Sequence, residues 1–355
     1  MIVAADYFSC NQALIDPTWK FARAQVAELD GWVVRLTDET GVEGLGYCHA
    51  IPAISTHGAG AQAGLAFLVP TLIGRRLDDL AVILDELDLV LAFQPTVKAA
   101  IDMALHDLLS RRLGIPINTL LGGGFRQLVE LSRILAIKQP SEMAEQAVKL
   151  AAQGYKQLKL KLSGETDADI KRIASVRSAV GDGIKLTLDP NQSYSAKQLM
   201  GAFRKMEKFD ISLIEQPVPA ADFEGLRLLT NTLPVAIEAD ESAQSVRDVF
   251  RLVSVRAVDV INLKITNLGG FRRFLQAVRI CEAGEVACRV GAAFGPSLLQ
   301  AMSLQAASVI RRLPHACELA EHLHLRDDPF TPLPVQEGTM TLPVGSGCGV
   351  TFQIE

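Results

Sequence analysis

Three carboxylates and one lysine recur at nearly constant intervals in the middle of the chain. Asp189, Glu215, Asp240 and Lys264 each end a short apolar run, and successive members are about 25 residues apart. Such regular spacing indicates a strand-plus-helix unit that repeats, with a charged side chain at the same end of each strand. Because buried charges must be paired or bound to metal, we expect these side chains to meet in one site.

The residue types at this site favour metal-assisted acid–base chemistry. Converging carboxylates offer oxygen ligands, and room for water and substrate oxygens favours Mg²⁺ over Ca²⁺. The sequence contains no clustered His and Cys set of the kind that binds zinc. A lysine near such a cation loses its proton more easily and can act as a base. We therefore predict removal of the proton α to a substrate carboxylate, with the cation holding the enediolate.

Lys159 and Lys161 add two more ammonium groups. They are two positions apart in one strand-like run, so their side chains point to the same face. The leucines that alternate with them fit the helix-packed outside of the fold, which turns both lysines inward. We therefore expect Lys161 and Lys264 to face each other across the site.

Each of these residues also has a simpler interpretation when it is taken alone. Asp189 precedes a proline, which is a common turn signal, and Lys159 and Lys161 could lie on the exposed face of an edge strand. The regular spacing of the whole set favours a site. Asn191 and Glu241 lie next to predicted ligands, where they would support those ligands or contact the substrate.

Strand-like and helix-like segments alternate from about residue 125 onward. This alternation predicts parallel strands, and eight such units favour a closed (β/α)8 barrel over an open sheet. In such a barrel the active site lies at the carboxyl ends of the strands, where the charged residues are found. A last short run at residues 315–319 is expected to close the ring.

The region before the barrel has the pattern of an α+β lid. We predict a capping domain at residues 1–124, the barrel at residues 125–324, and a segment at residues 325–355 that packs back on the cap. The cap is expected to carry substrate specificity.

Three local features of the cap are also predicted. Asp30-Gly31 indicates a hairpin turn between two strands. Residues 96–112 predict a helix with Thr96 as its N-cap. His57 lies in a loop rich in Gly, Ala and Ser, and it is a candidate for contact with the substrate.

The composition excludes several classes of protein. The 355 residues are 49% hydrophobic, which is ample for a large core, and the net charge of −5 comes without a basic stripe, so a nucleic-acid partner is not expected. No apolar stretch is long enough to span a membrane. The six cysteines form no C-x-x-C pair, which indicates reduced thiols in the cytoplasm.

Several short sequence motifs together resemble those of the enolase superfamily, in the branch of muconate lactonizing enzyme and mandelate racemase relatives. A helix at residues 99–116, followed by LLGGG, adds to the likeness, which covers nearly the whole chain. The superfamily pairs a Lys or His base with Mg²⁺. The matching words are KLKL at 159–162, LDPN at 188–191, IEQP at 214–217, EADES at 238–242 and NLKITNLGG at 262–270.

The resemblance implies an α/β fold, with an α+β capping domain over a modified (β/α)8 barrel of the β7α type. It implies that Lys161 and Lys264 are acid/base groups on the two faces of the substrate. Lys159 would sit by the substrate carboxylate and lower the pKa of Lys161. A small carboxylic acid is the expected substrate, and a homo-oligomer is the expected assembly. The ligands of Mg²⁺, with Mn²⁺ as a substitute, would be Asp189, Glu215 and Asp240.

The chain departs from the family pattern in two places. Many relatives carry a Glu within G-x-x-x-E-S after the seventh strand, where this chain has Phe294-Gly295. Dipeptide epimerases usually show Asp-x-Asp after the eighth strand, where this chain has Glu318-Leu319-Ala320-Glu321. Both departures count against dipeptide and succinylbenzoate-type substrates. Phe294 resembles an aromatic residue in relatives that act on proline derivatives and betaines, where the ring faces a cationic nitrogen.

The leading hypothesis is therefore a Mg²⁺-dependent isomerase or lyase. Racemisation, epimerisation, dehydration and cycloisomerisation all need the same intermediate, and the sequence does not choose among them. Two alternatives stay open. One is a Schiff-base aldolase that uses Lys264 or Lys161, which would not need three carboxylates. The other is a non-catalytic protein that binds small acids, although the complete set of ligands and lysines argues against it.

Overall fold

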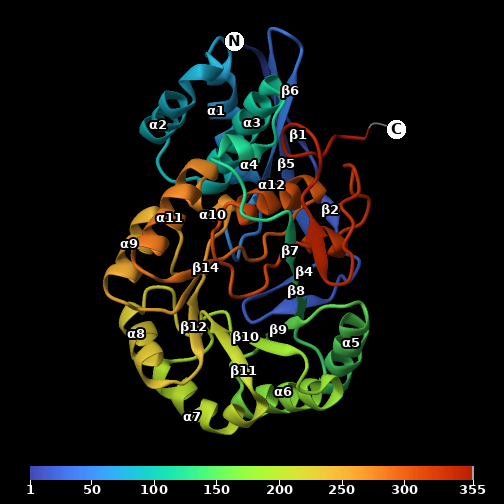
Figure 1. The fold of residues 1–355 in the computed structure, drawn as a ribbon, viewed down its shortest axis with the longest axis vertical. Coiled ribbons are helices and arrows are strands. Elements are labelled where there is room, and N and C mark those ends of the chain that lie inside the picture. Colours follow the sequence, from blue (N-terminus) through green and yellow to red (C-terminus); the bar gives the residue numbers. More distant parts are fainter. Residues whose placement is uncertain (354–355) are drawn as a thin grey trace.

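The computed structural model describes residues 1–353, and its N-terminal part is an α+β cap over a barrel (Figure 1). Strand β5 (Glu28–Asp38) is the centre of a four-stranded antiparallel sheet, and it pairs with the other three strands. Helix α3 (Pro95–Leu113) packs against strand β6 of this sheet. The remaining elements of the cap are β1 (Ile2–Ser9), β2 (Gln12–Ala13), β3 (Trp19–Phe21), β4 (Ala24–Val26), β6 (Glu43–Ala50), α1 (Gly58–Leu68), α2 (Leu80–Val90) and α4 (Ile117–Leu120).

Two local predictions for the cap are wrong. Asp30-Gly31 is not a turn, because β5 runs through it without a break and the link to β6 lies at residues 39–42. Glycine is required at position 31 for packing, since a Cβ there would lie 2.0 Å from Tyr47 Oη. Thr96 is not the N-cap of α3, because the helix begins at Pro95 and its N-cap is Gln94, which adopts a left-handed conformation. Proline at the first helical position explains this start.

The barrel is built from seven parallel strands in the described chain, in the spatial order β14-β13-β12-β11-β10-β9-β8. Helices alternate with these strands along the chain and lie outside the ring (Figure 1). The strands are β8 (Ser132–Leu135), β9 (Gln157–Lys161), β10 (Lys185–Asp189), β11 (Ile211–Glu215), β12 (Ala236–Ala239), β13 (Val260–Asn262) and β14 (Ala287–Arg289). The helices are α5 (Pro140–Ala152), α6 (Thr166–Val180), α7 (Ala196–Met206), α8 (Phe223–Thr232), α9 (Val246–Ser254), α10 (Ile265–Leu268), α11 (Phe271–Ala283) and α12 (Ser297–Ser308).

The predicted run at residues 315–319 occupies the gap between the first and last of these strands. Ser132 N donates a hydrogen bond to Cys317 O (2.8 Å), on the side of β8. On the other side, Glu318 N donates to Val290 O (3.0 Å), just after β14. The segment therefore closes the ring, and it brings Glu318 to the interior.

The chain after residue 325 returns toward the cap. Strand β15 (Thr339–Thr341) pairs antiparallel with β7 (Leu128–Glu130). Further on, Arg111 Nη2 of α3 donates to Val350 O (2.8 Å). The cap is thus completed by the end of the chain, as Figure 1 shows by the red segment beside it. The domain limits at residues 124 and 324 stay predictions.

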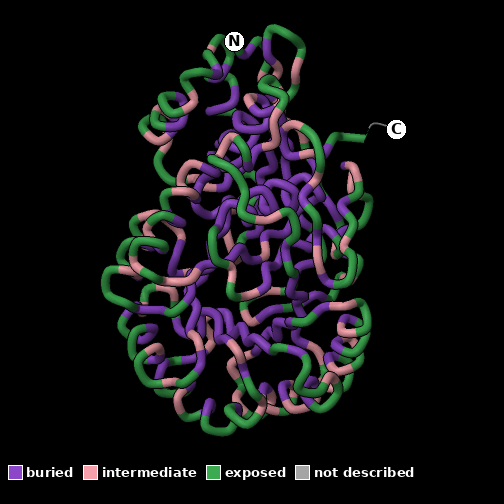
Figure 2. Tube along the Cα trace, in the orientation of Figure 1, coloured by how far each residue is buried: buried purple, intermediate pink, exposed green. Residues whose placement is uncertain are grey.

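Cap and barrel share a hydrophobic core. Val33, Tyr47 and Met103 of the cap belong to the same buried cluster as the barrel residues, while a second cluster is confined to the cap. Figure 2 shows buried chain running from the barrel interior into the cap. The cap therefore forms a fixed wall over the barrel. None of the helices within residues 1–353 is long and apolar enough to cross a membrane.

The close approach at Gly31 predicts a stability loss on substitution. We expect Gly31→Ala to lower the free energy of unfolding by about 1–3 kcal/mol, because the new methyl group must displace the buried Tyr47 ring. Urea unfolding followed by circular dichroism would measure this. Gly201→Ala is the control: it lies in α7 with no atom near its Cβ position, and it should gain up to about 1 kcal/mol. Equal stability of Gly31→Ala and wild type would contradict the packing argument.

Candidate active site

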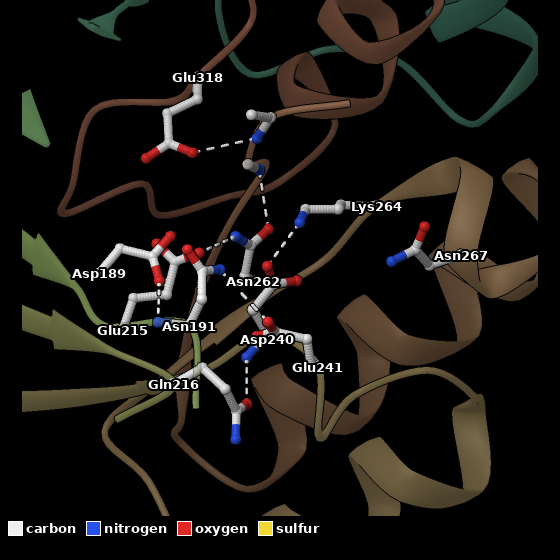
Figure 3. Close-up of polar contacts among 12 residues, drawn as sticks. Asp189, Asn191, Glu215, Gln216, Asp240, Glu241, Asn262, Lys264, Asn267 and Glu318 are labelled. Atoms are coloured by element: carbon white, nitrogen blue, oxygen red, sulfur yellow. Dashed lines mark hydrogen bonds and ion pairs between the residues drawn. The ribbon is translucent and has the colours of Figure 1, made fainter. Parts of the chain in front are cut away.

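Four charged side chains meet at the carboxyl ends of neighbouring strands. Asp189 and Glu215 are the last residues of β10 and β11, and Asp240 follows β12 directly. Lys264 lies two residues beyond β13. All four are buried, with at most 8% of their surface exposed. The barrel thus places them at one mouth, as the constant spacing predicted (Figure 3).

Two lysines face each other across this mouth. Lys161 pairs in register with Asp189, and its Nζ donates to Asp189 Oδ2 (2.5 Å) and to Asn191 Oδ1 (2.9 Å). On the other side, Lys264 Nζ donates to Asp240 Oδ2 (2.6 Å). Their strands β9 and β13 are four positions apart in the ring, so the two ammonium groups lie on opposite sides.

A second layer of charge lies beneath the mouth, and the sequence analysis missed half of it. Arg289 of β14 is fully buried, and its guanidinium donates to Glu215 Oε2 (2.6 Å), Glu238 Oε1 (2.8 Å) and Glu318 Oε1 (2.7 Å). Lys159 Nζ donates to Glu215 Oε2 (2.9 Å) and Glu318 Oε2 (2.7 Å). Two cations therefore hold Glu215 from below. Alternation along each strand is the signal that could have found Glu238 and Arg289.

These contacts determine the pKa values of the carboxyl groups. Burial and the nearby Asp189 raise the pKa of Glu215, but Lys159 and Arg289 outweigh both and lower it to about 2. Burial raises the pKa of Glu238 to about 8, although Arg289 opposes the shift.

The protein groups around Lys264 act on its pKa in opposite directions. Burial acts to lower this pKa, but Asp240 and Glu215 outweigh burial and raise it. The protein groups alone therefore keep the ammonium protonated. A lysine base at this position requires that another cation take up the negative charge of the carboxylates.

The three carboxylates supply oxygen donors, which are the ligands that a hard cation prefers. Asp189, Glu215 and Asp240 are buried oxygen donors on three adjacent strands, which is the ligand chemistry of Mg²⁺. Within residues 1–353, however, no three His, Cys, Asp or Glu side chains lie close enough together to hold a metal ion. In this structure each of the three carboxylates instead accepts a hydrogen bond from a lysine ammonium group.

Amide side chains orient the charged groups (Figure 3). Gln216 Oε1 accepts hydrogen bonds from the backbone N–H groups of Asp240 (2.9 Å) and Ser242 (3.0 Å), which fixes the turn after β12. Asn262 Nδ2 donates to Glu215 Oε1 (3.2 Å), while its Oδ1 accepts from Gly291 N (2.9 Å). Amide side chains therefore hold the Glu215 carboxylate directly and fix the backbone that carries Asp240.

A cavity lies between this mouth and the cap. Its barrel side carries the lysines and polar groups, and its cap side is mainly aromatic and aliphatic. Lys161 Nζ lies 5.6 Å from the centre of the Phe21 ring, so the cap closes directly over the lysine. The lining residues are Ile134, Lys159, Lys161, Asn191, Asp240, Glu241, Gln244, Lys264, Asn267, Ala292, Ala293 and Phe294 from the barrel, and Trp19, Phe21, His49, Ile51 and Ile54 from the cap.

The structure brings three of the five secondary candidates into this cavity. Asn191 and Glu241 both line it, and Asn191 Nδ2 donates to Glu241 Oε1 (3.3 Å). Phe294 also lines it, with its ring 4.8 Å from that of Trp19 in an edge-on arrangement. Glu318 does not line the cavity, because it is buried beneath the mouth.

His57 is the candidate that the structure places outside the cavity. Its side chain is exposed, and its Nδ1 accepts a hydrogen bond from Gly60 N (3.3 Å) as the N-cap of α1. The histidine of the cap that lines the cavity is His49 on β6. His57 was predicted because it lies in a polar loop, whereas the alternation of side chains along a strand would have indicated His49.

Comparisons with known proteins agree with this arrangement. Residues 142–355 match the family described as "Enolase C-terminal domain-like", and residues 8–122 match "Mandelate racemase / muconate lactonizing enzyme, N-terminal domain". The chain is 34% identical over 277 residues to the hydrophobic dipeptide epimerase of Enterococcus faecalis, covering 77% of each protein. It is 34% identical over 287 residues to a chloromuconate cycloisomerase of Cupriavidus necator, covering 80% of this chain and 78% of the relative.

Solved structures of relatives resemble this chain over its whole fold. A dipeptide epimerase from Enterococcus faecalis V583, complexed with Mg and the dipeptide L-Leu-L-Tyr, matches with a TM-score of 0.94. The two sequences are 29% identical, and the match covers 99% of both chains. These relatives are isomerases, and they differ in substrate.

The buried guanidinium predicts a pH-dependent stability loss. Arg289→Met should lower the free energy of unfolding by about 3–5 kcal/mol at pH 8, because it leaves buried carboxylates without their partner. The pKa values of Glu215 and Glu318, now lowered, would then rise above those in the unfolded chain, and the pKa of Glu238, already raised, would rise further. The stability loss should therefore shrink as the pH falls from 8 to 5. Urea unfolding at both pH values measures it, with Arg204→Met on the exposed face of α7 as the control. A loss that is equal at both pH values would contradict the charge argument.

Proposed function

The chain belongs to the enolase superfamily, in the mandelate racemase and muconate lactonizing enzyme family, and from this membership and the site geometry we propose that it removes the proton α to the carboxylate of a small acid. The observation that carries the proposal is the pair of ammonium groups, Lys161 and Lys264, on opposite sides of a buried carboxylate cluster. Two proton carriers that face each other across one cavity suit a carbon that loses a proton on one face and gains one on the other.

Each lysine has its own role in this proposal. Lys161 Nζ holds or takes a proton on one face of the substrate, and Lys264 Nζ does so on the other. Lys159 lies deeper, and its charge attracts the substrate carboxylate toward the floor of the cavity. Asn191 holds the Lys161 ammonium group by a hydrogen bond of 2.9 Å, which fixes the direction of proton transfer. The cap excludes water from above.

We propose Mg²⁺ as the cofactor, with Mn²⁺ as a substitute. The residues that would hold it are Asp189, Glu215 and Asp240. When bound, the cation would neutralise these carboxylates and withdraw electron density from the substrate carboxylate, which makes the α proton more acidic. A solved relative that contains Mg supports this choice of metal.

The proposed proton removal leads to more than one product. Return of a proton on the opposite face gives racemisation or epimerisation, and loss of a β-hydroxyl group gives dehydration. Cycloisomerisation passes through the same kind of intermediate: an oxygen of the substrate adds to a double bond, and the α carbon of the resulting enediolate then takes up a proton. The relatives named above include an epimerase of dipeptides and a cycloisomerase of chloromuconate, so relationship alone does not choose the substrate.

The proposal extends to cell compartment and assembly. All six cysteines are buried and unpaired, which suits the reducing cytoplasm. Phe67, Leu89 and Phe93 of the cap expose more than half of their surface, and this apolar area suits contact with a second copy of the chain.

The decisive experiment is a screen in D₂O with the Mg²⁺-loaded protein. The library contains amino acids, N-acyl amino acids, proline betaines and sugar acids, and proton NMR follows the Cα signal. We expect deuterium to replace the Cα proton of at least one acid, and EDTA to stop the exchange. Full activity in EDTA together with borohydride trapping would indicate a Schiff base. Binding without exchange across the library would indicate a non-catalytic protein.

Lys264→Ala should abolish turnover of whichever acid exchanges. We expect a loss of at least about 10²–10⁴-fold in the exchange rate, because one of the two proton carriers is missing. Calorimetric titration should still detect Mg²⁺ binding, since the proposed ligands are intact. Lys197→Ala, an exposed lysine of α7, is the matched control. Wild-type exchange in Lys264→Ala would remove Lys264 from the mechanism.

Asp240→Asn should weaken Mg²⁺ binding by at least about tenfold, because a charged oxygen donor becomes neutral while the size of the side chain is kept. The same titration measures this change. Asp167→Asn in the first turn of α6 is the control, and its affinity should match the wild type. An unchanged Mg²⁺ titration in Asp240→Asn would reject its role as a ligand.

A further inference from the structure

Within the described chain, two cap side chains that line the cavity have unused hydrogen-bonding groups: Trp19 through its indole N–H, which only donates, and His49 through both ring nitrogens. Along β6, Leu45 and Tyr47 belong to the core shared with the barrel, while Cys48 belongs to the core of the cap. Side chains alternate along a strand, so His49 points the same way as Tyr47, toward the barrel. His49 lines the cavity together with Lys264.

Neither ring nitrogen of His49 has a hydrogen-bond partner within residues 1–353, although only 2% of its surface is exposed. A buried polar group without a partner costs about 1–3 kcal/mol. A side chain that carries two such groups at the wall of a cavity indicates that the partner belongs to the ligand. Burial and the charge of Lys264 lower the pKa of His49 to about 4, so the ring is neutral near pH 7. A neutral imidazole has one donor and one acceptor.

The surroundings of His49 restrict what that ligand group can be. The other cap residues among the described lining set are Trp19, Phe21, Ile51 and Ile54, and none of these is charged. A formal charge on this part of the substrate would therefore lack a counterion from the cap. The ammonium groups of the cavity lie on the barrel side, where the proposed function places the substrate carboxylate.

We propose that His49 binds a hydroxyl group of the substrate close to the α carbon, and that the substrates are compact monocarboxylic acids with such a hydroxyl. A hydroxyl both donates and accepts, so it matches the two free positions of the neutral ring. The inference rests on the proposed function for the position of the carboxylate.

The test compares acids that differ by one hydroxyl group. Threonine, serine and glycerate are each paired with the acid that lacks the β-hydroxyl, namely 2-aminobutyrate, alanine and lactate. With the Mg²⁺-loaded wild type, we expect the hydroxylated member of at least one pair to bind about 10- to 100-fold more tightly. His49→Leu should lose this preference by weakening the hydroxylated acid alone, and His49→Asn should keep part of it. His57→Leu, an exposed histidine of the same cap, should behave as the wild type.

A second readout does not depend on turnover. In protein labelled with ¹⁵N at its six histidines, the signal that is missing from His49→Leu should shift when the hydroxylated acid is added. Thermal unfolding by circular dichroism shows whether His49→Leu is folded. A hydroxyl preference that survives in His49→Leu, or a wild type without preference in any pair, would overturn the inference. Binding that depends on His49 without deuterium exchange would instead overturn the proposed function alone.

Discussion

The pairing of buried charges inside the barrel is the constraint on which the site depends. Asp189, Glu215 and Asp240 are removed from water by the ring of strands, and a carboxylate in that position is tolerated only with a cation beside it. Lys159 and Arg289 supply that charge from below, and they hold Glu215 in its ionised form. The same contacts occupy the carboxylate oxygens, so a metal ion must compete with ammonium groups that are already bound.

The cap shapes this site because it shares a core with the barrel. Tyr47 of β6 packs within the barrel cluster, and Trp19 of β3 stacks edge-on against Phe294. The wall of the cavity is therefore fixed by the same packing that stabilises the fold. The cavity therefore has a mainly apolar wall, interrupted by His49, on one side and a dense set of charges on the other.

The fold class was predictable because it depends on periodic features of the sequence. The spacing of about 25 residues between Asp189, Glu215 and Asp240 reflects one strand-plus-helix unit, and alternation turned Lys159 and Lys161 inward. Arg289 was missed as a residue of the interior, although alternation along β14 could have indicated it, and its three carboxylate partners come from separate segments that only the fold brings together.

Local sequence signals gave wrong predictions at positions where tertiary packing determines the conformation or the role of the residue. Asp30-Gly31 has the residues of a tight turn, but Gly31 is there to make room for Tyr47. His57 was favoured by its place in a polar loop, where it caps a helix, whereas His49 reaches the cavity from a strand. Such choices depend on which neighbours are brought close by the fold, and a single sequence does not record that.

The return of the chain end to the cap affects the order in which the protein is assembled. Asp107 of α3 is fully buried, and its Oδ1 accepts a hydrogen bond from Cys348 N (2.7 Å), a residue 241 positions later in the chain. A ribosome makes α3 early, and Leu45 N and Arg111 Nε, which donate to Asp107 Oδ2, are made with it, but the partner of Oδ1 follows only after a further 241 residues. The buried face of α3 therefore stays incompletely satisfied until this late segment of the chain has been made.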